Sequence, residues 1–117
     1  MRVKLLTKAE EAALLKNGRA SQETGDGSKL APVVKLFTPD AQCTWLLTEI
    51  DPEEPSQAFG LCDLGMGYPE LGWVSLEELA GVRGQLGLPI ERDRFFRAKF
   101  TIAEYAERAR QSERIVA

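Results

Sequence analysis

Hydrophobic and polar positions change their spacing along the chain, and this spacing predicts which segments are helices and which are strands. Near the C-terminus, apolar or small residues recur at Ile102, Tyr105, Ala106 and Ala109. Steps of three and four residues place these side chains on one side of an α-helix. The pattern predicts a C-terminal helix that packs on the core through this side.

Helix starts are marked by a hydroxyl residue followed three positions later by glutamate. This signature occurs at Thr7 with Glu10, at Ser75 with Glu78 and at Thr101 with Glu104. The hydroxyl accepts a hydrogen bond from the glutamate N–H, and the glutamate carboxylate accepts one from the N–H of the hydroxyl residue. We therefore predict helices over 8–17, over 76–83 and from 102 onward. Gly18 is expected to end the first and Gly84 the second.

Alternating and apolar runs between these helices predict strands at 33–37, 44–50, 58–64 and 71–74, with a charged fifth strand at 91–96 on an edge. Short connections favour antiparallel neighbours. The polar segment 18–31 is predicted to be a mobile surface loop, and the tail 111–117 to fray. The expected fold is a single α+β domain over 1–117, with a mainly antiparallel meander sheet of four to five short strands and about three helices.

Composition excludes several kinds of site. The chain has no histidine, and its 15 basic and 18 acidic residues give a net charge of −3. Catalytic arrangements that need histidine cannot form within the chain, and Cys43 and Cys62 are too few for a four-ligand zinc site. We expect no metal and no cofactor. The N-terminus lacks an apolar signal region and no run is long enough to span a membrane, so we expect a cytoplasmic protein with two free thiols.

The chain resembles a bacterial family called domain of unknown function 2958. The resemblance runs from Leu5 to Ala109 and is carried, in order, by LLTKAEEAALLKNGRA, PVVKLFTPDAQCTWLLTEIDPEEP, AFGLCDLGMGYPELGWVSLEEL and VRGQLGLPIERDRFF. It implies a small bacterial accessory protein of the kind often encoded on mobile genetic elements. It implies no activity, substrate or catalytic residue.

Two acidic residues are candidates for chemistry. Asp63 interrupts an apolar strand, and Glu49 lies in the strand before it. If the two strands pair about the centre of their loop, Trp45 lies opposite Asp63, and Glu49 is roughly 14 Å from Asp63. Hydrolytic carboxylate pairs lie about 5 to 9.5 Å apart. We therefore expect each acid to bond a loop amide or an arginine at a strand end.

Aromatic residues offer a candidate contact surface. Tyr68 lies in a Gly/Pro turn and Trp73 lies just before a helix, and both residue types anchor protein interfaces. For Trp45, Phe59, Trp73 and Phe95, however, the interpretation that we favour is that they fill the core.

Basic residues suggest a second surface. On a strand over 91–96, Arg92 and Arg94 would point to one side and Glu91 and Asp93 to the other. The result would be a one-sided basic strip, or a solvated edge strand with weak ion pairs.

These observations favour a non-enzymatic protein-binding or regulatory module with partner-binding residues Tyr68, Trp73, Arg92 and Arg94. One alternative is a weak nucleic-acid-associated protein that uses the arginine-rich edge. The other is a histidine-independent enzyme centred on Asp63.

Overall fold

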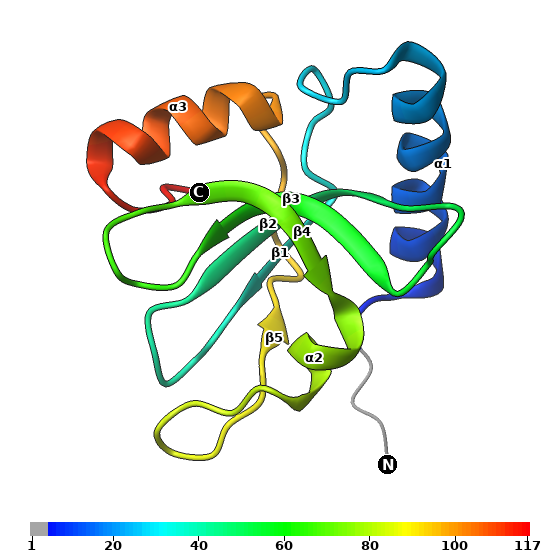
Figure 1. Cartoon of the computed structure of the whole chain (residues 1–117). Helices are drawn as coiled ribbons and strands as arrows, with labels where there is room; N and C mark the ends of the chain where they lie inside the picture. Colours follow the sequence, from blue (N-terminus) through cyan, green and yellow to red (C-terminus); the bar gives the residue numbers. More distant parts are fainter. Residues whose placement is uncertain (1–4) are drawn as a thin grey trace.

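Four strands that follow one another in the chain form an antiparallel meander in the computed structural model, which describes residues 5–117. They are β1 (Val34–Phe37), β2 (Thr44–Ile50), β3 (Gln57–Asp63) and β4 (Glu70–Ser75). The short strand β5 (Glu91–Arg92) pairs with β1, so the sheet order is β4-β3-β2-β1-β5 (Figure 1). The predicted α+β class and antiparallel meander are confirmed, as is the edge position of the fifth strand.

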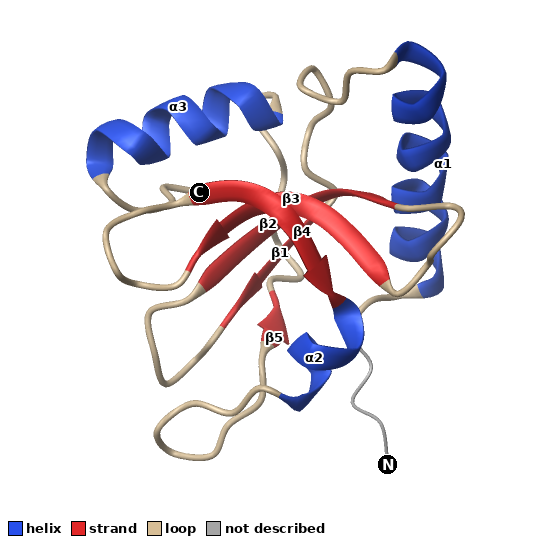
Figure 2. Ribbon diagram, in the orientation of Figure 1, coloured by secondary structure: helices blue, strands red, loops and turns tan. Residues whose placement is uncertain are grey.

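Helices flank this sheet (Figure 2). They are α1 (Lys8–Thr24), α2 (Leu76–Gly81) and α3 (Ile102–Ser112). Within the described residues, no helix has the length and apolar character needed to cross a membrane.

The sheet is covered on both faces because side chains alternate along β2. Trp45 and Leu47 point to one face, where they join a core with Leu14 of α1 and Leu79 of α2. Leu46 points to the other face.

The second core lies under α3. Leu46 joins Leu61 of β3 and the α3 residues Ile102, Tyr105 and Ala109. The helical stripe read from the sequence therefore packs on the sheet as predicted.

All three predicted helix starts form. Thr7 and Thr101 each take part in a reciprocal pair of hydrogen bonds with the glutamate three residues on. At α2 the Ser75 hydroxyl accepts the Glu78 N–H at 3.2 Å. The end of α2 is earlier than predicted, because the helix stops at Gly81 and Val82 is already extended.

The prediction that Gly18 ends the first helix is wrong. α1 continues to Thr24, and the left-handed residue that ends it is Gly25, with φ +74° and its N–H donated to the Ser21 carbonyl at 2.8 Å. Gly18 is buried inside the helix, where an added Cβ would lie 2.0 Å from the Ile50 carbonyl oxygen. Glycine is needed here for the close approach of α1 to β2, not for a turn.

The segment after α1 bridges to the start of α3. The Ser28 and Leu30 carbonyls accept the N–H groups of Ala103 and Ile102, at 3.2 and 2.7 Å. These first-turn amides have no partner within their own helix. The region 18–31, predicted to be a loop, thus consists of the last part of α1 and a connection bonded to α3.

A register shift divides β2. Near its C-terminal end, Glu49 lies opposite Phe59 as the sequence predicts. The pairing shifts between Leu47 and Glu49, so Asp63 lies opposite Thr44 rather than opposite Trp45. The extra residue is Thr48, which forms a β-bulge.

We predict that Gly18→Ala destabilises the protein, because its Cβ would meet backbone atoms that cannot move independently. The expected loss is about 1–3 kcal/mol in the free energy of unfolding, measured by urea denaturation. Gly81→Ala is the matched control, since a Cβ at Gly81 in α2 meets no atom within 4 Å. We expect the control to be neutral or slightly stabilising. Equal stability of both variants would contradict the close helix–strand contact.

Candidate functional site

A groove of about 1000 Å³ lies where the ends of β1, β2 and β3 meet the segment after β5 and the end of α3. It brings together three residues singled out in the sequence, Asp63, Arg92 and Arg94. Their hydrogen bonds decide what this groove can do.

Asp63 is a buried structural acceptor. Its Oδ1 accepts the Gly65 N–H at 2.8 Å, and its Oδ2 accepts the Ile115 N–H at 2.9 Å. The carboxylate therefore joins the β3–β4 turn to the segment after α3. Both oxygens are engaged by backbone donors, as expected for an acid at a strand end.

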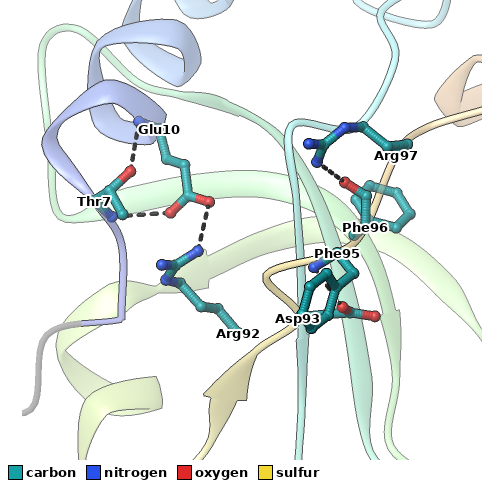
Figure 3. Close-up of polar contacts among 7 residues, drawn as sticks. All are labelled: Thr7, Glu10, Arg92, Asp93, Phe95, Phe96 and Arg97. Atoms are coloured by element: carbon teal, nitrogen blue, oxygen red, sulfur yellow. Dashed lines mark hydrogen bonds and ion pairs between the residues drawn. The ribbon is translucent and has the colours of Figure 1, made fainter.

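Arg92 is directed toward the start of α1 (Figure 3). Its Nη1 lies 3.3 Å from Glu10 Oε2, while Glu10 Oε1 accepts the Thr7 N–H at 2.9 Å. One carboxylate thus caps α1 and holds β5 against it. The Arg92 guanidinium is therefore engaged in an ion pair within the protein.

The predicted strand over 91–96 is too long. It ends at Arg92 because Asp93 Oδ1 accepts the Phe95 N–H at 2.9 Å and turns the chain. The alternation that would align Arg92 with Arg94 is lost. Arg94 instead lies over the Phe95 ring, 5.7 Å from its centroid.

The groove is mixed in charge rather than uniformly basic. Lys35 Nζ lies 3.9 Å from Asp93 Oδ2 and donates to the Ala117 carbonyl at 2.8 Å. Arg92 is paired with Glu10. The one-sided basic strip considered from the sequence does not form.

Glu49 lies apart from Asp63, in a second cavity of about 200 Å³. Only 6% of Glu49 is exposed, and its buried Oε2 has no hydrogen-bond partner. Burial raises the pKa of this carboxyl group, the polar Ser21 side chain opposes the rise, and the charge of Asp51 adds to it. The two acids lie in different cavities and do not form a dyad.

The two candidate aromatic residues are exposed. Tyr68 is 81% exposed in the β3–β4 turn, and Trp73 is 52% exposed on β4. The expectation that Trp73 and Phe95 fill the core is wrong, since Phe95 is 82% exposed; Trp45 does lie in the core. Phe95 lies beyond the end of β5, and Trp73 lies on an edge strand that α3 does not cover fully.

Trp73 brings together the edge strand and the second cavity. Its ring makes an edge-on contact with Phe59, with centroids 5.2 Å apart, and it lines the cavity that contains Glu49. Ser21 and Gly25, which also line it, were missed from the sequence because the helix was expected to end at Gly18. The Gly25-Asp26-Gly27 turn was the available signal.

Cys43 and Cys62 are free thiols, as predicted. Burial raises the pKa of Cys62 to about 11, which disfavours the reactive thiolate. Among residues 5–117 no group of three or more His, Cys, Asp or Glu side chains could hold a metal ion.

A family model described as "Protein of unknown function (DUF2958)" matches residues 5–116, so the chain belongs to this family. No curated protein and no solved structure matches the chain.

We predict that Asp63→Asn destabilises the protein. An amide side chain has only one acceptor oxygen, so the N–H of Gly65 or of Ile115 loses its partner. The expected cost is about 1–3 kcal/mol in the free energy of unfolding. The exposed Glu70→Gln serves as the control for loss of one carboxylate charge. A fully stable Asp63→Asn protein would argue against the clamp.

We also predict a pH dependence of stability from Glu49. Its pKa is raised in the folded protein, so the native state holds the proton after the unfolded chain has released it. This contribution makes stability fall as pH rises from the ordinary value of 4.5 through the folded pKa. In urea titrations across this range, Glu49→Gln should remove that part of the slope. The exposed Glu54→Gln should retain it, and identical slopes in all three proteins would contradict the assignment.

Proposed function

We propose that the protein is a non-enzymatic contact module that binds another protein by adding an extended segment of that partner to the open edge of β4. The observation that carries this proposal is the position of β4 at the edge of the sheet, bonded on one side only, with exposed apolar side chains along it.

The open edge offers backbone groups for pairing. The Leu76 N–H donates to the Ser56 carbonyl at 2.8 Å. The neighbouring residues Gln57 and Ser75 lie opposite each other and therefore form a non-hydrogen-bonded pair. Because antiparallel pairs alternate, the N–H and C=O groups of Leu71 and Trp73 point away from β3. A strand laid along β4 can bond to all four groups.

Side chains on this edge add apolar contact area. Leu71 is 45% exposed and lies two residues from Trp73, so both side chains point to the α3 face of the sheet. Tyr68 lies in the preceding turn next to Gly67, which has φ +86°. Exposed Tyr and Trp beside a fixed backbone are typical of interface anchors.

The alternatives have less support. A nucleic-acid role would need an unpaired basic surface, whereas Arg92 and Lys35 lie beside carboxylates. An enzyme centred on Asp63 would need a carboxylate free to exchange protons, whereas both Asp63 oxygens accept backbone N–H groups. The family resemblance is our ground for an accessory role in mobile genetic elements, and the free thiols agree with a reducing cytoplasm.

We predict that Trp73→Thr and Tyr68→Ala weaken partner binding while the fold is kept. The partner would be identified by capture from the native host and mass spectrometry, then purified for affinity measurement. Each change should cost roughly 1–2 kcal/mol or more, the amount typical of interface anchors. Leu86→Thr is the matched control, because Leu86 is exposed in a different loop.

The strand-addition geometry has its own test within the same measurement. Leu71→Pro removes an N–H that points to solvent, which an edge strand tolerates, whereas Leu71→Thr keeps it. Leu71→Pro should weaken partner binding more than Leu71→Thr does. Equal affinity of these two variants would exclude backbone pairing along β4, and unchanged affinity of Trp73→Thr and Tyr68→Ala would exclude this surface.

A further inference from the structure

The cavity beside Trp73 has the composition of a cation site. Glu49 and Asp51 line it from the end of β2 and the turn that follows, and no Lys or Arg of the described chain does. Two carboxyl groups without a basic neighbour in a small cavity create a negative potential. A positively charged group is the ligand that reduces this electrostatic cost.

The end of α1 adds to the same potential. Ser21 and Gly25 line the cavity at the C-terminal end of the helix, and the last turn of this helix contains no basic residue. Helix C-termini carry partial negative charge on their unpaired carbonyl groups. Cations bind favourably there.

Glu49 supplies an unused acceptor. Its side chain is more than nine-tenths buried, it lines the cavity, and Oε2 has no hydrogen-bond partner. Buried carboxylate oxygens are usually bonded to a donor. A donor brought by a ligand would satisfy this oxygen.

The ring of Trp73 defines the chemistry of that ligand. It borders the cavity, and an aromatic ring is a favourable neighbour for a cation, while Phe59 contacts the ring edge-on. Two carboxylates supply at most four of the six to eight oxygens that a calcium ion takes, and magnesium would have to keep most of its water shell here. A volume of about 200 Å³ accommodates one side chain or a small amine, but not a nucleotide.

We propose that this cavity binds a single alkylammonium or guanidinium group, with Glu49 and Asp51 as its acceptors and Trp73 as its aromatic wall. The group is either part of a free small amine or the head of a Lys or Arg side chain of a polypeptide. This inference goes beyond strand binding at β4, and Glu49 can be changed without altering the β4 edge.

The test is a titration followed by ¹H–¹⁵N NMR. Methylguanidinium and butylammonium should shift the Trp73 indole signal and the amides of Ser21 to Gly25. Methylurea, a neutral analogue of similar shape, should not. Glu49→Gln should weaken binding of the cations about tenfold or more. Glu54→Gln, an exposed acid in the β2–β3 loop, should leave it unchanged.

Protonation supplies a second readout. Bound cations favour the charged carboxylate, so affinity should rise with pH as Glu49 loses its proton, and Asp51 is the other titratable group lining the cavity. Glu49→Gln should bind with a flatter pH profile. If this variant does not fold, Asp51→Asn replaces it, with the same expectation of weaker binding.

The outcomes separate clearly. Binding of methylurea as strong as that of methylguanidinium, or binding unaffected by Glu49→Gln or its replacement, would overturn the proposal, as would stronger binding of Ca²⁺ or Mg²⁺ than of either organic cation. Agmatine and blocked peptides containing Lys, Arg or norleucine then distinguish the sources. Tighter binding of the Lys or Arg peptide assigns the site to a polypeptide, and tighter binding of agmatine assigns it to a free amine. Partner capture by the β4 variants tests strand addition only. A loss of capture in those variants would not change the result of the amine titration.

Discussion

The β-bulge at Thr48 is the constraint on which the arrangement of both sheet faces depends. Thr48 is buried, its hydroxyl donates to the Phe59 carbonyl at 3.2 Å, and its own carbonyl accepts the Asn17 side-chain amide at 2.9 Å. The extra residue shifts the pairing of β2 with β3 by one position. Leu46 before the bulge and Glu49 after it consequently face the same side of the sheet. Without the shift, Glu49 would point toward the α1 and α2 core, where a carboxylate has no place.

The same bulge explains how a charged side chain came to be buried. It places Glu49 in the cavity that the end of α1 and Trp73 also line. The close approach of α1 to β2 at Gly18 brings the helix near enough to cover the Glu49 side chain. Burial of a carboxylate with an unsatisfied oxygen lowers stability. Asp63 has both carboxylate oxygens bonded, whereas Glu49 Oε2, like the buried Oδ1 of the half-buried Asp40, has no partner within the described part of the chain. Local departures of this kind concentrate at functional sites, which directs attention to the Glu49 cavity rather than to the larger groove.

Sequence patterns predicted the elements well because the signals for them are local. The helix starts at Thr7, Ser75 and Thr101 depend on residues three positions apart, and each start forms as expected. What local patterns could not supply was contact between distant segments. The sequence around Gly18 looks like that of a helix-ending glycine. Its packing role is visible only in the structure, where an added Cβ would collide with the Ile50 carbonyl oxygen. Arg92 and Phe95 are similar cases, since Glu10 and the Asp93 turn determine their positions. Of the candidate residues, Tyr68 lies in an exposed turn, as its Gly and Pro neighbours indicate.

Edge strands are usually protected against uncontrolled pairing, and β4 is protected at its ends only. At its start, Pro69 lacks an N–H and Glu70 carries a charge. At its end, α2 begins directly after Ser75 and stops the strand. Between these limits the outward backbone groups belong to Leu71 and Trp73, whose side chains are both apolar. A short, bounded and apolar edge suits a specific extended segment and disfavours open-ended aggregation. Because Trp73 borders the Glu49 cavity as well, the edge and the cavity are physically contiguous. A bound segment that carries a cationic side chain would reach both, and its specificity would then come from charge as well as from backbone pairing.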